Sequence, residues 1–124
     1  MRIVLAAVTT IAVTIGLAAC TGHDRTAAEL TGGDPRRGQQ AVRAYGCHTC
    51  HTIPGVPGVH GVVAPSLAKM ADRAHVAGHL PNTPDRLIEW IRHPQEPNRP
   101  SAMPDLGVTE ADARDIAAYL YTLR

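Results

Sequence analysis

The feature that most constrains this chain is a five-residue pattern near its middle, Cys47-His48-Thr49-Cys50-His51. Cysteines three positions apart lie one helical turn apart, so both sulfurs can meet one partner from the same side. The histidine directly after the second cysteine adds an imidazole, a common metal ligand. Covalent haem attachment, a redox-active dithiol and half of a zinc site all use patterns of this kind.

The rest of the sequence separates these chemistries. A zinc site would need a second ligand pair, and the one remaining cysteine, Cys20, belongs to an export signal described below. A thioredoxin-like dithiol would follow a strand, and no strand pattern or internal repeat is evident. In haem attachment the thiols of Cys47 and Cys50 add to the two haem vinyl groups and His51 ligates iron. The pattern therefore predicts one covalent haem c.

The composition gives the haem a structural purpose. The 124 residues include no Phe, one Trp and three Tyr, so few large apolar side chains are available for a core. Chains with about 90 ordered residues and so small a core usually need an additional stabilising element, such as a disulfide, a metal or a cofactor. A buried haem would provide it, and we expect a single domain.

The amino-terminal residues 1–19 are predicted to be an export signal rather than part of that domain. Arg2 is followed by an uncharged stretch, Ile3–Cys20, of about 18 residues. It ends in Leu17-Ala18-Ala19-Cys20, which resembles the lipobox of bacterial lipoproteins, where the signal is cut before an acylated cysteine. This resemblance implies a lipid anchor on Cys20. An uncut signal anchor and an ordinary secretory signal are the alternatives, and both also export the chain.

Between anchor and domain the sequence predicts a spacer. Thr21–Gly33 is polar and small without an apolar period, so we expect residues 20–33 to be the anchor cysteine and a flexible spacer, and residues 34–124 to be the domain. Without residues 1–19 the chain has 11 basic and 11 acidic groups, since Arg2 is the only charge removed. This balance makes nucleic acid an unlikely partner.

A first helix is predicted to begin after Asp34, an N-cap residue, with Pro35 at the first helical position, and to run to about Tyr45. One narrow stripe of this helix carries mainly small residues at helical spacing. These residues are Gly38, Ala41, Val42 and, at the end, Tyr45.

Two more helices have similar start signals. Thr83 caps one that ends at His93, before a proline, and Thr109 caps the last. Nine of the ten prolines lie between positions 54 and 104, so that region is expected to hold only short helical pieces, with Ser66–Arg73 as the best candidate. The residues expected to be buried are Leu87, Trp90 and Ile91 on the first of these helices and Ala113, Ile116, Ala117 and Leu120 on the last.

Several of these motifs together resemble a class I c-type cytochrome over residues 33–124. Gly33-Asp34-Pro35, Gly38 and Tyr45-Gly46 are similar to the first helix of that family, and Ile116-Ala117-Ala118-Tyr119-Leu120 to its last. The resemblance implies an all-α, class I cytochrome c fold, with about three main helices and short helical pieces around one haem. It also implies that the first and last helices cross, with Gly38 facing Ile116 and Tyr119.

The resemblance also assigns roles to residues outside the attachment pattern. Pro65-Ser66-Leu67 is similar to the family's haem-packing loop, which implies that the Pro65 carbonyl accepts a hydrogen bond from His51. Trp90 resembles the tryptophan on the haem propionate side, a role compatible with ordinary core packing. Ala102-Met103-Pro104 resembles the segment that supplies the sixth ligand, so Met103 is expected to bind iron.

The sequence offers two alternatives to Met103 as the axial ligand. Met70 lies in the predicted short helix, where an isolated methionine more often fills core space. Bis-histidine ligation is the other alternative, with His75 and His79 as the foremost candidates. The histidines that could supply such a ligand are His48, His60, His75, His79 and His93.

These observations predict a single-electron carrier rather than an enzyme. Met103 would fill the coordination site that a peroxidase-like enzyme or gas sensor keeps open, and no acid/base pair stands in a defined relation to the haem. Segments such as Met103-Pro104-Asp105-Leu106-Gly107 resemble cytochrome domains associated with respiratory haem-copper oxidases. The expected setting is therefore the outer side of a bacterial membrane, with such an oxidase as partner.

Overall fold

The computed structural model describes residues 22–58, 61–96 and 101–124. The predicted signal peptide, Cys20 and His60 lie outside these residues. No helix in the described part has the length and apolar character needed to cross a bilayer. The elements, in chain order, are α2 (Pro35–Ala44), η1 (Cys47–Thr49), η2 (Met70–Asp72), β1 (His75–Val76), β2 (Leu80–Pro81), α3 (Pro84–Arg92) and α4 (Glu110–Thr122), where η marks a 3-10 helix.

Helix α2 forms where its local signals predict it. The Asp34 carboxylate accepts hydrogen bonds from the amides of Arg36 and Arg37 at 2.8 and 3.1 Å, which caps the helix. After Ala44 the chain turns through Gly46, whose φ of 73° is accessible to glycine at little cost. This turn sends the chain directly into η1 and the cysteine pattern.

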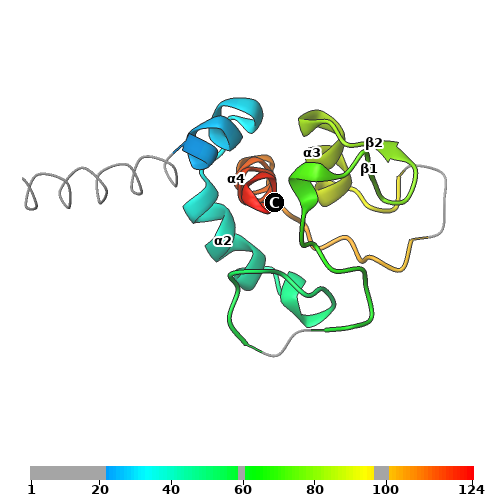
Figure 1. The fold of residues 1–124 in the computed structure, drawn as a ribbon. Coiled ribbons are helices and arrows are strands. Elements are labelled where there is room, and N and C mark those ends of the chain that lie inside the picture. The colour runs from blue at the N-terminus through cyan, green and yellow to red at the C-terminus, as the bar shows by residue number, and fades with distance from the viewer. Residues whose placement is uncertain (1–21, 59–60, 97–100) are drawn as a thin grey trace, which may run out of the picture.

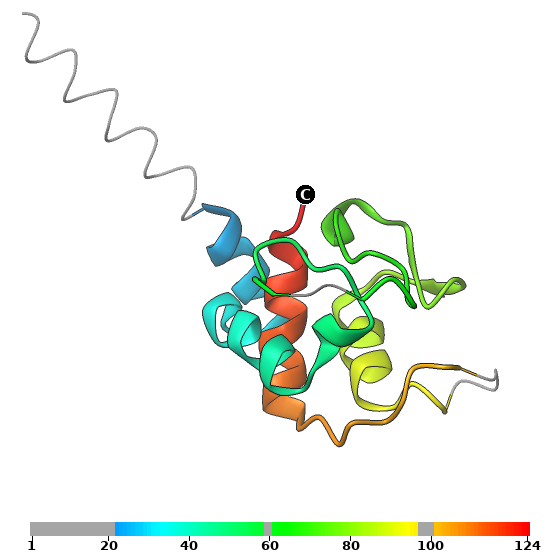
Figure 2. The same cartoon turned by 90° about the horizontal axis from the view of Figure 1, so that it is seen from below.

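Helix α4 is the centre of the fold (Figures 1 and 2). Its cap, Thr109, accepts a hydrogen bond from the Asp112 amide at 3.2 Å. The helix packs against α2, α3 and η2, and nearly every side of its second half is covered. Its buried residues are Ala113, Asp115, Ile116, Ala117, Ala118, Tyr119, Leu120 and Tyr121.

The crossing of α2 over α4 is the tightest contact between these elements. A Cβ placed on Gly38 would lie 1.9 Å from the Asp115 carbonyl oxygen and 2.9 Å from the Tyr119 Cβ. The predicted contact with Tyr119 is therefore confirmed. The nearest atom is the Asp115 carbonyl oxygen, because the backbones of the two helices touch at this point.

Helix α3 has the predicted start and end. Thr83 caps it through the Arg86 amide at 3.4 Å, and His93 follows its last residue. Its buried residues are Leu87, Ile88 and Ile91. Trp90 is only half-buried, so its expected place on the buried face is corrected: the face turned to the core passes through Ile88.

Two expectations for the proline-rich region are wrong. The predicted helix Ser66–Arg73 is reduced to η2, Met70–Asp72, because Lys69 adopts a left-handed φ of 56° that an α-helix cannot contain. A small antiparallel ladder also occurs where no strand was predicted, with His75 opposite Pro81 and Val76 opposite Leu80. Two-residue strands are too short to show alternation in a sequence.

The expectation of a spacer without fixed structure is also corrected. Residues 22–31 are helical, and this stretch is called the N-terminal segment below. Ala27 and Thr31 are each only 2% exposed. In Figures 1 and 2 the segment lies beside α2 and α4. Small residues hid this contact from the sequence, because Ala27 and Thr31 do not form a recognisable apolar stripe.

Candidate functional site

The cysteine pattern forms a compact turn at the end of α2. Cys47–Thr49 is the 3-10 helix η1, and the amides of Cys50 and His51 both donate to the Cys47 carbonyl, at 3.3 and 3.0 Å. This winding places Cys47 and Cys50 one turn apart. The two half-buried cysteines are free thiols, with no disulfide between them. Both sulfurs therefore remain available for bonds to a third group.

Burial raises the pKa of the Cys47 thiol. The neutral thiol therefore predominates at neutral pH, whereas catalytic dithiols depend on a lowered pKa that exposes a thiolate. This difference argues against the redox-dithiol alternative. Among the described residues, no group of three His, Cys, Asp or Glu side chains is placed so that it could hold a metal ion.

His51 is oriented by the loop that follows it. Its Nδ1 lies 2.7 Å from the Pro65 carbonyl oxygen, which can only accept, so Nδ1 carries the proton and donates. The predicted hydrogen bond is confirmed. Because the proton resides on Nδ1, the lone pair of Nε2 is available to a metal, the arrangement found for most metal-binding histidines.

A covering loop, residues 61–67, runs along the attachment turn. Three backbone hydrogen bonds join the loop to the turn, and in each an amide of the loop donates to a carbonyl of the turn. They run from Gly61 to His48 at 3.0 Å, from Ala64 to Cys50 at 3.1 Å and from Leu67 to Thr52 at 2.9 Å. Leu67 is half-buried and packs against the hydrophobic core. The loop thereby ties the turn to the rest of the domain.

Gly61 is a site residue that the sequence does not reveal. A Cβ at this position would lie 2.0 Å from the Thr49 carbonyl oxygen, so the loop approaches the attachment turn closely only because residue 61 is glycine. Its partner is twelve positions away across an irregular region. A glycine within a proline-rich stretch gives no local signal of such a contact.

The two candidate methionines have different surroundings. Met70 is 4% exposed and belongs to the hydrophobic core, with its carbonyl bound by the Asn82 side chain at 2.9 Å. Met103 is half-buried on an irregular segment. The Gln95 amide nitrogen donates to the carbonyls of Met103 and Ser101, at 2.6 and 2.9 Å, and so fixes this segment. Gln95 is a second residue that the sequence did not single out.

Not all predicted site residues are joined by direct contacts. Among the described residues, no hydrogen bond links Met103 or Trp90 to the attachment turn. Trp90 lines a cavity of about 240 Å³ beside α3. The other lining residues are Leu80, Arg86, Glu89, His93 and Glu96.

The alternative histidine ligands are dispersed in the described part of the chain. His75 is exposed on β1, and His79 Nδ1 lies 2.9 Å from the Ala77 carbonyl. His93 Nδ1 is 3.9 Å from an Asp105 carboxylate oxygen. His48 lies within the attachment turn itself, and its buried Nδ1 has no hydrogen-bond partner.

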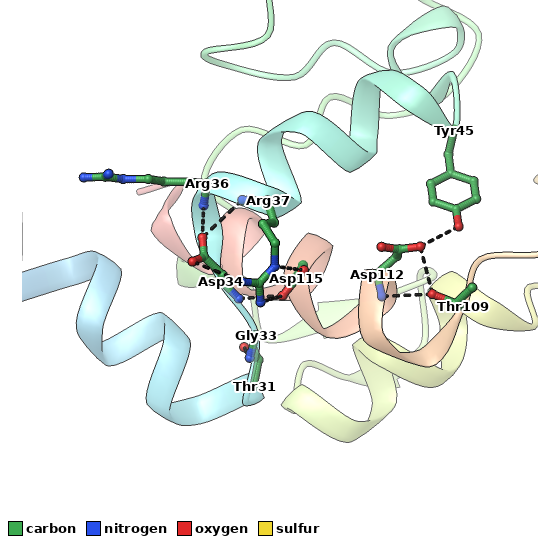
Figure 3. A network of polar contacts seen from close by, with 9 residues as sticks. All are labelled: Thr31, Gly33, Asp34, Arg36, Arg37, Tyr45, Thr109, Asp112 and Asp115. Atoms are coloured by element: carbon green, nitrogen blue, oxygen red, sulfur yellow. Dashed lines mark hydrogen bonds and ion pairs between the residues drawn. The ribbon is translucent and has the colours of Figure 1, made fainter.

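A polar cluster at the N-terminal end of α2 joins this helix to α4 (Figure 3). The buried Asp115 carboxylate accepts from the Arg37 guanidinium at 2.7 and 3.0 Å and from the Asp34 amide at 2.6 Å. Burial alone would raise the pKa of Asp115, but these hydrogen bonds together lower it. Asp115 therefore remains a carboxylate and clamps the start of α2 to α4.

The residues of the attachment turn fit a covalent haem. Two free thiols stand one turn apart, the adjoining histidine has its Nδ1 proton engaged, and its Nε2 is left for iron. This donor set matches what a c-type haem requires. The side chains present therefore fit the cofactor that the sequence pattern predicts.

Comparison with known proteins agrees with this geometry. The family model described as Cytochrome c matches residues 35–124, which is most of the chain and includes the attachment turn, the covering loop and α4. Comparisons with curated proteins and with solved structures returned no match. The chain belongs to the cytochrome c family, the haem-based electron carriers in which haem c is bound covalently.

Proposed function

We propose that the protein carries single electrons with His51 and Met103 as the two axial ligands of its haem. The observation that carries this proposal is the hydrogen bond from His51 Nδ1 to the Pro65 carbonyl, which leaves the lone pair of Nε2 free to bind iron. Cys47 and Cys50 supply the thioether sulfurs. When bound, the haem supplies an iron that alternates between the ferrous and ferric states.

The surroundings of the two methionines support Met103 as the second ligand. Met70 contributes to the core that holds η2 against α4, and removing its side chain from there would leave a cavity. Met103 lies on a segment anchored by Gln95, so its thioether can be presented without disturbing the core. A neutral thioether stabilises ferrous iron, which gives a comparatively high reduction potential.

A spectroscopic comparison of two variants tests this ligation. Oxidised wild-type protein is expected to show the weak near-infrared sulfur-to-iron band. Met103→Ala should lose the band, whereas Met70→Leu, a nearly volume-conserving change in the core, should retain it. The reverse outcome would assign the ligand to Met70, and a band absent from the wild type would favour histidine ligation.

We also propose that the domain is tethered to the outer side of a bacterial membrane by lipid on Cys20 and delivers electrons to a respiratory haem-copper oxidase. The sequence ending in Cys20 supports the tether, and the high potential expected for a His/Met haem suits a terminal oxidase. Redox partners meet through small, transient interfaces, so a tether raises encounter frequency without a tight complex.

Mass analysis of the mature protein tests the tether. The first residue should be residue 20 and should carry acyl groups, and Cys20→Ser should release the domain from the membrane fraction. Cys20→Ser leaves the attachment turn intact, so the haem spectrum should be unchanged. A mature chain that begins elsewhere would remove the lipid anchor from the proposal.

A further inference from the structure

The N-terminal segment is attached to the domain by buried contacts. Ala27 is 2% exposed and belongs to the hydrophobic core, and Thr31 is equally buried. The Thr31 hydroxyl donates to the Ala27 carbonyl at 2.9 Å and accepts from the Gly33 amide at 3.2 Å. One side chain thus binds both the last turn of the segment and the chain that leads to α2.

Helix α4 also contacts the junction between the N-terminal segment and α2 (Figure 3). Arg114 Nη1 donates to the Thr31 carbonyl at 3.1 Å, and the Asp34 amide donates to Asp115 at 2.6 Å. A Cβ on Gly33 would lie 2.2 Å from the Arg114 carbonyl oxygen, so the junction rests directly on the α4 backbone. Flexible linkers make no such contacts.

The helical residues extend back to Gly22, two positions after Cys20. Two fully extended residues span at most about 7 Å. A lipid on Cys20 would therefore lie close to an element that is itself fixed to α4. The haem domain therefore cannot rotate freely relative to the lipid, as it could on a long flexible tether.

We propose that the N-terminal segment is a rigid spacer that holds the haem domain in one preferred orientation on the surface of a lipid bilayer. This inference rests on the proposed lipid anchor at Cys20. The segment stands on the bilayer instead of entering it, because its exposed residues include the polar and charged side chains His23, Asp24 and Arg25.

The orientation can be measured on the lipidated holoprotein in aligned bilayers, through the linear dichroism of the haem absorption bands. The wild type should show clear dichroism. Inserting a twelve-residue Gly-Ser linker between Thr21 and Gly22 should abolish it, since the domain then tumbles freely. A helical Glu-Ala-Ala-Ala-Lys insertion of similar length is the matched control, and it should retain dichroism.

A second pair of variants tests the docking in the full chain. Gly33→Ala should force the junction away from α4, reduce the dichroism and speed amide hydrogen exchange over residues 27–34. Gly22→Ala adds the same methyl group where no atom lies within 4 Å, and it should change neither quantity. Equal exchange in both variants would contradict the docked spacer.

Mass analysis of the same samples separates the two claims. If Cys20 carries lipid but the wild type shows no dichroism, or if the Gly-Ser insertion leaves the dichroism unchanged, the rigid spacer is wrong and the anchor stands. If Cys20 carries no lipid, the proposed anchor fails and this inference fails with it.

Discussion

The α2–α4 crossing and the attachment turn with its covering loop are held by different means. At the crossing, Gly38 brings two helix backbones into contact and the buried Asp115 carboxylate binds both Arg37 and Asp34. At the attachment turn, the short 3-10 helix η1 and the residues that follow it are joined to the irregular covering loop by three separate backbone hydrogen bonds. The first region is a helical frame, and the second is a loop arranged around two thiols and an imidazole.

This difference indicates where the haem is needed for stability. Packed helix backbones have little freedom to adjust, so a substitution there should destabilise the protein whether or not haem is attached. Irregular loops with few buried contacts open locally at low cost unless something else restrains them. Two thioether bonds would restrain the attachment turn and, through His51 and Pro65, the covering loop.

The largest expected effect comes from removing both thiols. Cys47→Ala with Cys50→Ala should abolish covalent attachment, so that acidic solvent extracts any haem from the denatured chain. Amide exchange over residues 61–67 should then accelerate strongly, while α4 stays comparatively protected. Haem that remains covalently bound to this double variant would contradict the assigned attachment. If amide exchange in α4 accelerated as much as in residues 61–67, the two regions would not differ in their dependence on haem.

Gly38→Val should have the largest effect on the frame. The added side chain meets a backbone carbonyl, which cannot move without separating the helices, so we expect a loss of about 3 kcal/mol in the free energy of unfolding. Gln40→Ala, on the exposed side of the same helix, is the control and should be nearly neutral. An unchanged melting midpoint for Gly38→Val would rule out the contact.

Asp115→Asn tests the ionic part of the frame and should cost about 1.5 kcal/mol at neutral pH. The pKa of Asp115 is lowered in the folded protein, so its stabilising effect is fully present above the ordinary value of 3.8 and is lost as the pH falls through the lowered value. Urea unfolding at neutral and acidic pH should show the difference between wild type and variant shrinking toward low pH. A constant difference would mean that the charge contributes nothing.

Gly61→Ala should have the smallest effect, about 0.5 kcal/mol. Its Cβ would clash with the Thr49 carbonyl almost as closely as a Cβ on Gly38 clashes with Asp115, but the covering loop can shift. Thermal unfolding of the holoprotein, with Gly38→Ala measured beside it, compares the two regions directly. Equal losses would show that the covering loop is as rigid as the helix crossing.

The helical frame could largely be predicted from the sequence because its signals are local. Asp34, Thr83 and Thr109 cap their helices through amides two or three residues away. The His51 contact with Pro65 followed from a family resemblance. The docking of Thr31 could not be predicted, because its partner Arg114 lies 83 positions away. Nor could the left-handed Lys69, since the type of residue alone gives little warning of such a conformation.

We propose that this protein passes single electrons to a membrane oxidase, and oxidation of the reduced holoprotein tests this proposal most directly. Membranes that contain a haem-copper oxidase should oxidise it rapidly, and cyanide should inhibit this oxidation by blocking the oxidase. Peroxide alone, without membranes, should oxidise it slowly. Slow oxidation by the membranes together with rapid oxidation by peroxide would contradict the electron-carrier account and favour a haem enzyme.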